Sequence, residues 1–65
     1  MNKIIRIARL RKGYSQKRLS LLSGISYHTL NRIERSKQKV SLRDALTLSR
    51  LLDLSIEDIG KEGRK

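Results

Sequence analysis

The chain has 65 residues, a formal net charge of +10, no cysteine and a single histidine. At this length it forms one domain at most, and it buries only about 60% of the surface that the unfolded chain exposes. The composition excludes disulfides and thiolate metal sites, a lone histidine does not form a metal centre, and no apolar run approaches the roughly 20 residues that cross a bilayer.

Glycine and serine residues divide the first half of the chain into expected helices. Gly13 and Gly24 readily adopt the left-handed conformation that ends a helix. Ser15 and Ser26 are typical N-cap residues, because a serine hydroxyl can accept a hydrogen bond from a free N–H of the first helical turn. These signals predict helices at about residues 2–12, 16–23 and 27–35.

The second half repeats the same device twice. Ser41 with Asp44, and Ser55 with Asp58, resemble capping boxes in which aspartate stands in place of glutamate. No segment alternates like a strand over a useful length. We therefore expect a single all-α domain over residues 1–65. Its two further helices are expected at residues 42–52 and 56–60, followed by a short basic tail at residues 61–65.

The second and third helices have the size of a helix-turn-helix motif. Gly24 allows the chain to reverse, and Ile25 is expected to be buried in the angle between the two helices. The inward faces are apolar, with Leu19, Leu30 and Ile33. The outward face of the third helix is polar, with Tyr27, His28, Asn31, Arg32 and Arg35.

Positive charge is unevenly distributed along the chain. Residues 1–43 hold twelve Lys and Arg against the single acid Glu34, whereas residues 44–65 hold four basic and five acidic residues. One-sided positive charge favours a polyanionic partner, because neutralising phosphates releases condensed counterions. From charge alone, an anionic membrane surface, an acidic protein or mere solubility remain as alternatives to nucleic acid.

Over about residues 4–59, individual residues of the chain match those of a known protein family. The chain resembles the Cro-type, lambda-repressor-like (XRE) helix-turn-helix family at Arg9, Gly13, Tyr14, Ser15, Gln16, Leu19, Gly24, Ile25, Ser26, Leu30, Ile33, Glu34, Lys37, Ser41 and Leu42. The resemblance implies a compact five-helix domain that binds double-stranded DNA, acting on palindromic operators as a homodimer. The chain departs from the family pattern at Ser20 (Ala is favoured), Ser36 (Gly), Val40 (Pro) and Asp53 (Gly).

The resemblance also assigns roles to side chains. It implies base contacts for the third helix, and the chemistry agrees because Arg32 can donate two parallel hydrogen bonds to guanine O6 and N7. The expected base-reading residues are Tyr27, His28, Thr29, Asn31 and Arg32. The expected phosphate-contacting residues are Gln16, Lys17, Arg35, Lys37 and Lys39, which position the protein without reading sequence.

Two structural roles complete the prediction. The family pattern implies an ion pair between Arg9 and Glu34, which explains a lone acid in a basic region better than solvation does. The nearly neutral C-terminal region is expected to close the core, to pair with a second copy of the chain, or to do both. Its candidate dimer residues are Leu51, Leu54, Ile56 and Ile59.

The sequence thus predicts a sequence-specific regulator of transcription, most simply a repressor, and not an enzyme. No pair of carboxylates, nucleophile with a base, or phosphate-binding glycine loop is present. The alternative is an antitoxin-like or accessory module that keeps the fold and binds another protein. We expect a cytoplasmic protein of prokaryotic, phage or plasmid origin, with no cofactor, no membrane association and no small-molecule ligand.

Overall fold

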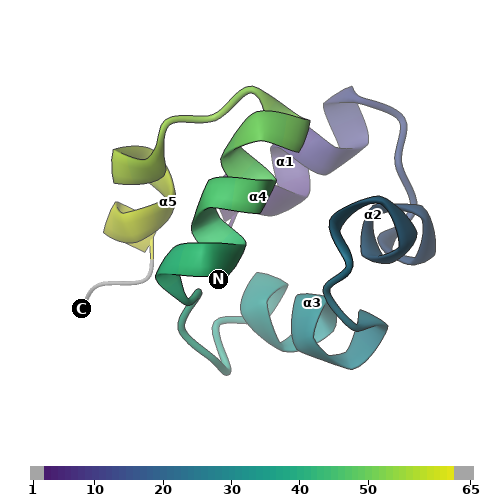
Figure 1. Cartoon of the computed structure of the whole chain (residues 1–65), viewed down its shortest axis with the longest axis horizontal. Helices are drawn as coiled ribbons and strands as arrows, with labels where there is room; N and C mark the ends of the chain where they lie inside the picture. The colour runs from purple at the N-terminus through teal and green to yellow at the C-terminus, as the bar shows by residue number, and fades with distance from the viewer. Residues whose placement is uncertain (1–2, 63–65) are drawn as a thin grey trace.

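The computed structural model describes residues 3–62, and the side chains of residues 3–59. Within this range the chain forms helices only, which confirms the all-α prediction (Figure 1). The five helices are α1 (Lys3–Arg11), α2 (Gln16–Ser23), α3 (Tyr27–Glu34), α4 (Leu42–Leu52) and α5 (Ile56–Glu62).

Serine hydroxyls begin four of the helices. Each hydroxyl accepts a hydrogen bond from the backbone N–H three residues later, at 3.0–3.2 Å. These bonds satisfy donors that have no partner inside the helix, which explains why the helices start where they do. The four serines are Ser15, Ser26, Ser41 and Ser55.

Left-handed residues follow the first four helices. Gly13 and Gly24 adopt φ of 78° and 75°, and Ser36 and Asp53 adopt φ of 57° and 55°. Glycine reaches this region without penalty, whereas an L-residue with a Cβ costs about 1–2 kcal/mol there. The two departures from the family's glycines therefore lie at sites that do require left-handed geometry.

Three helix ends differ from the expected bounds. The first helix ends at Arg11, one residue before the expected end at Lys12. The third helix ends at Glu34, one residue early, because the chain leaves helical geometry at Arg35 and reverses at Ser36. The fifth helix continues to Glu62, two residues beyond the expected end, so the expected tail at residues 61–65 begins inside α5. Residues 63–65 and Asn2 lie outside the described residues.

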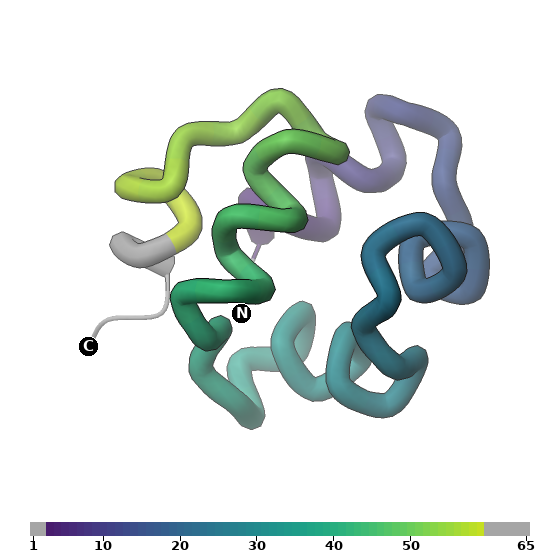
Figure 2. The backbone as a smooth tube through the Cα atoms, viewed as in Figure 1, coloured from purple at the N-terminus to yellow at the C-terminus, as the bar shows by residue number. Residues whose placement is uncertain are grey.

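The core lies where α4 crosses the other helices. α4 contacts α1, α2 and α5, and α2 and α3 pack together as a pair beside it (Figures 1 and 2). The expected inward residues of the helix-turn-helix are all buried in this core. Its members are Ile5, Ala8, Leu19, Ile25, Leu30, Ile33, Ala45, Leu48, Leu52 and Ile59.

The C-terminal region closes this core. Ile59 is buried, and Leu51 and Leu54 are half-buried and pack against the cluster. Ile59 therefore offers no surface to a second copy in this fold, which corrects its placement among the dimer residues. Ile56 is exposed on the first turn of α5.

Candidate nucleic-acid interface

The helix-turn-helix consists of α2, a three-residue turn and α3. Gly24 ends α2 in the left-handed conformation, and its N–H donates to the Ser20 carbonyl at 2.9 Å. The Ser20 hydroxyl in turn donates to the carbonyl of the buried Ile25. The serine that replaces the family's alanine thus bonds the turn to α2, so the angle between α2 and α3 is held by polar as well as apolar contacts.

The outward face of α3 presents most of the expected base-reading residues. Tyr27, His28 and Arg32 are exposed, and the rings of Tyr27 and His28 meet edge to face with centroids 6.2 Å apart. Thr29 is half-buried, and its hydroxyl accepts a hydrogen bond from the Ser26 hydroxyl at 2.8 Å. Tyr27, His28 and Arg32 are therefore the most accessible of the five, while Thr29 is bonded to the helix cap.

A continuous chain of polar contacts connects α1, α2 and α3. The Arg9 guanidinium donates to both carboxylate oxygens of Glu34, from Nε at 2.8 Å and from Nη2 at 3.0 Å, and from Nη1 to the Tyr14 carbonyl at 2.9 Å. Gln16 Nε2 donates to Glu34 Oε1 at 3.2 Å, and Asn31 Nδ2 donates to Gln16 Oε1 at 3.3 Å. The structure thus contains the ion pair that the resemblance implies, and Gln16 extends it to Asn31, in the middle of α3, the expected recognition helix.

This polar chain changes the role expected of Asn31. The side chain is half-buried and its amide is bonded to Gln16, so it is less available to an adenine than a free amide on the outer face. Gln16 lies at the N-terminus of α2, where free N–H groups attract anions. Gln16 therefore links the buried ion pair to the place where a phosphate is expected.

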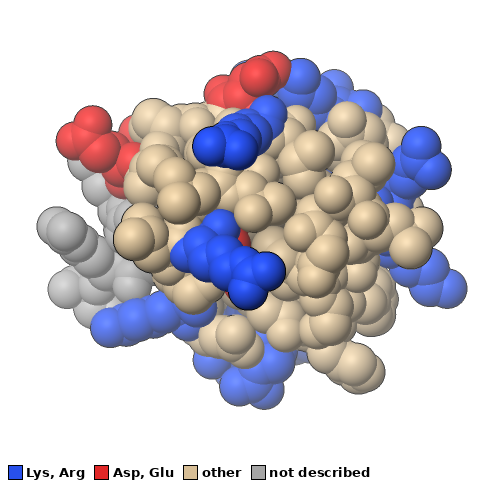
Figure 3. Space-filling model, in the orientation of Figure 1, with Lys and Arg blue, Asp and Glu red and all other residues tan. Residues whose placement is uncertain are grey.

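The expected phosphate-contacting cations lie on the surface. All four cations are exposed. Gln16, the uncharged fifth residue expected to contact phosphate, is half-buried. In Figure 3, Lys and Arg side chains lie along the upper, right and lower edges of the molecule, and also on the face toward the viewer, near its centre, among uncharged residues. The four cations are Lys17, Arg35, Lys37 and Lys39.

One contact of Arg32 was not predicted from the sequence. Its Nε donates to Gln38 Oε1, in the loop after α3, at 3.2 Å. The two residues are six positions apart and no longer share a helix, so no helical spacing rule pairs them. The contact follows from the reversal of the chain at Ser36.

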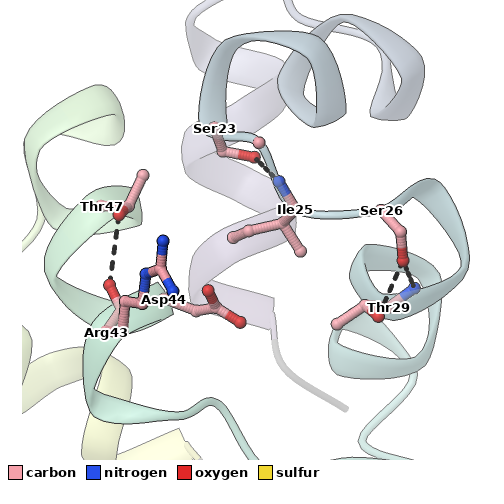
Figure 4. Close-up of a pocket in the computed structure, with 8 residues that line it drawn as sticks. Ser23, Ile25, Ser26, Thr29, Arg43, Asp44 and Thr47 are labelled. Atoms are coloured by element: carbon pink, nitrogen blue, oxygen red, sulfur yellow. Dashed lines mark hydrogen bonds between the residues drawn. The ribbon is translucent and has the colours of Figure 1, made fainter.

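A polar cavity of about 360 Å³ lies between the turn of the motif and the first part of α4 (Figure 4). Its hydroxyl groups are bonded locally: Ser23 accepts from the Ile25 N–H at 3.1 Å, Ser26 bonds to Thr29, and Thr47 donates to the Arg43 carbonyl at 3.2 Å. No buried side-chain polar atom among the described residues lacks a partner. The serine and threonine hydroxyls that line the cavity are therefore already hydrogen-bonded within the chain. Its lining residues are Ser23, Gly24, Ile25, Ser26, Thr29, Arg43, Asp44 and Thr47.

One ion pair on the surface raises the pKa of a lysine. The Lys12 ammonium donates to Asp53 Oδ2 at 2.5 Å, joining the loop after α1 to the left-handed residue after α4. The hydrogen bond that Lys12 donates to Asp53, followed by the negative charge of Asp53, raises the pKa of Lys12 above its ordinary value of 10.5. The pair lies outside the polar chain of Arg9 and α3.

Comparison with known proteins assigns the chain to a family. Residues 5–59 match a family model described as helix-turn-helix. No curated protein sequence and no solved structure matches the chain. Among the described residues there is no cluster of His, Cys, Asp and Glu that could hold a metal ion, and no helix long and apolar enough to cross a membrane.

Proposed function

We propose that this chain, which belongs to the XRE-type helix-turn-helix family of DNA-binding domains, is a sequence-specific repressor that binds a palindromic operator as a homodimer. The observation that carries the proposal is the outward face of α3, where Arg32 stands exposed beside Tyr27 and His28. A helix of this kind fits the major groove, where each base pair presents a distinct pattern of donors and acceptors.

Charge supports the same partner. The region that contains α1, α2 and α3 holds nearly all of the excess positive charge, and its one acid, Glu34, is buried against Arg9. A DNA phosphate approaching α3 therefore meets cations and helix N-termini without an exposed carboxylate from residues 3–43. This arrangement steers the protein to DNA and leaves specificity to α3.

Dimerisation is proposed through the C-terminal region. Leu51 and Leu54 are half-buried and Ile56 is exposed, so these side chains keep apolar surface exposed after the core is closed. The nearly neutral charge of residues 44–65 lowers the repulsion between two copies of a strongly basic chain. Two copies related by a two-fold axis would read half-sites about 34 Å apart.

The test begins with duplexes selected from a randomised library and compares wild type with Arg32→Ala at about 50 and 200 mM salt. We expect a palindromic consensus, a complex of two chains per duplex, and a loss of about 1–3 kcal/mol of discrimination at one base pair per half-site in the variant. The matched control, Lys39→Ala, removes an exposed cation, and it should weaken binding to every duplex alike and reduce the salt slope by about one.

Equal binding to every duplex, lost at the higher salt concentration, would contradict base reading. The positive charge alone would then account for DNA binding. The protein-interaction module would become the better description of the domain.

A further inference from the structure

The loop after α3 returns toward the helix that it leaves. Ser36, in the left-handed conformation, donates its N–H to the Ile33 carbonyl at 3.0 Å, and Lys37 donates to the Arg32 carbonyl at 2.8 Å. These two bonds form a Schellman motif, which fixes the exit direction of the chain. The backbone next to Gln38 is thereby tied to the backbone of Arg32 itself.

This exit direction places the Gln38 amide at the guanidinium of Arg32. Oε1 of Gln38 accepts a hydrogen bond from Arg32 Nε at 3.2 Å, and both side chains are exposed. The other polar side chain near the middle of α3, Asn31, is bonded to Gln16. The Arg32 side chain is therefore hydrogen-bonded to Gln38, whereas its neighbour Asn31 is bonded to α2.

We infer that Gln38 is a positioning residue that sets the orientation in which Arg32 reads a guanine. The inference rests on the proposed DNA-reading function and names a specificity-determining residue outside the recognition helix. It concerns Gln38 alone, since Lys37 and Lys39 on either side carry no acceptor in their side chains.

The chemistry of the guanidinium gives this contact a direction. Arg carries five N–H donors, one on Nε and two on each Nη. With Nε bonded to Gln38, the donors that remain for guanine O6 and N7 are those of Nη1 and Nη2, so Arg32 must approach the base end-on. An Arg without this partner can also approach side-on, through Nε and one Nη, and samples more rotamers before binding.

The contact gains strength when DNA binds. In the free protein both partners are exposed, and water competes for their hydrogen bond. In the major groove, excluded water leaves the same bond in a lower dielectric, where it is stronger. Without this hydrogen bond, the Arg32 side chain becomes ordered only when DNA binds. The preference for the guanine that Arg32 reads should then fall by about 3- to 10-fold, which is the cost of ordering one long side chain.

The first test uses the free protein. In NMR spectra of wild type and Gln38→Met, the exchange of the Arg32 Nε proton with water is measured directly. Met keeps the length of Gln and replaces its amide oxygen with a thioether, which is a much weaker acceptor. We expect faster exchange in Gln38→Met with an unchanged melting temperature, and equal exchange rates would overturn the inference before any DNA is added.

The second test uses duplexes selected with wild-type protein and variants of them substituted at each base pair. Gln38→Met should relax preference at the base pair that Arg32→Ala relaxes and nowhere else. Gln38→Glu, which keeps an acceptor, should retain that preference while binding every duplex more weakly, because it adds a negative charge near phosphates. The matched control Lys39→Met should lower affinity uniformly.

Two failures are distinguishable in this design. If Arg32→Ala relaxes one base pair and Gln38→Met relaxes none, Gln38 does not position Arg32 and the proposed function stands. If Arg32→Ala relaxes no base pair, base reading by Arg32 is wrong and the inference that rests on it is overturned as well.

Discussion

Removing the carboxylate of Glu34 tests the polar chain at its buried end. Glu34 is 3% exposed and Arg9 8% exposed, and the carboxylate receives two hydrogen bonds from Arg9 and one from Gln16. Glu34→Ala leaves the Arg9 charge buried with only the Tyr14 carbonyl as a partner. Loss of one member of a buried ion pair costs about 3–5 kcal/mol.

That loss is large for a domain of this size. At 0.05–0.15 kcal/mol per residue, a chain of 65 residues has a free energy of unfolding of roughly 3–10 kcal/mol. We therefore expect Glu34→Ala to remove about a third or more of the free energy of unfolding, and at the lower end of this range to unfold the protein at 25 °C. Urea titration followed by far-ultraviolet circular dichroism measures the difference.

Two comparison variants separate charge from packing. Glu57→Ala removes an exposed glutamate from the first turn of α5, and it should lower the free energy of unfolding by no more than about 1 kcal/mol, the value of a carboxylate near a helix N-terminus. The double variant Arg9→Met with Glu34→Leu replaces both charges by apolar groups, and it should recover much of the lost stability. A loss below about 1 kcal/mol in Glu34→Ala would refute the reasoning, because that is the value of a pair exposed to solvent.

Two further predictions concern the left-handed residues and the ion pair at one of them. Ser36→Gly should raise the free energy of unfolding by about 0.5–1 kcal/mol, because the relief of left-handed strain exceeds the added entropy of glycine in the unfolded chain; an unchanged urea midpoint would contradict it. Lys12→Met should melt below wild type at neutral pH. Since the pKa of Lys12 is raised in the folded state, its contribution is complete below the ordinary value of 10.5 and is lost as the pH rises through the raised pKa, so the two melting temperatures should converge there. A difference that persists above that pH would assign the effect to the alkyl chain.

The elements of the fold were predictable because their signals are local. A serine at the start of a helix bonds an N–H three residues later, and a glycine after the last helical turn lets the chain reverse at its own position. Ser15, Ser26 and Gly24 therefore marked the bounds of α2 and the start of α3 directly in the sequence. The inward residues followed from helical spacing, which places Leu30 and Ile33 on one face.

The remaining details depend on how the helices pack. The burial of Ile59 depends on how α5 approaches α1 and α4, and the apolar pattern of a short helix does not distinguish a core position from an interface position. The early end of α3 depends on a serine adopting a conformation for which glycine is the usual signal. The bonds from Asn31 to Gln16 and from Arg32 to Gln38 join different segments, so no spacing within one helix predicts them.

These two bonds give neighbouring residues of α3 different functions. Asn31 is connected through Gln16 to the buried carboxylate of Glu34, so a substitution there disturbs a contact between α2 and α3 as well as the DNA-facing surface. Arg32 is bonded to an exposed loop residue, so its substitution leaves the packing of the helices intact. On the proposed function, a change in DNA preference on replacing Arg32 would be attributed to lost base contacts, whereas a change on replacing Asn31 would combine any lost base contact with the loss of a contact between α2 and α3. If the proposed function holds, the relation between α2 and α3 and the reading of a base thus belong to adjacent side chains, Asn31 and Arg32, whose hydrogen-bond partners are separate.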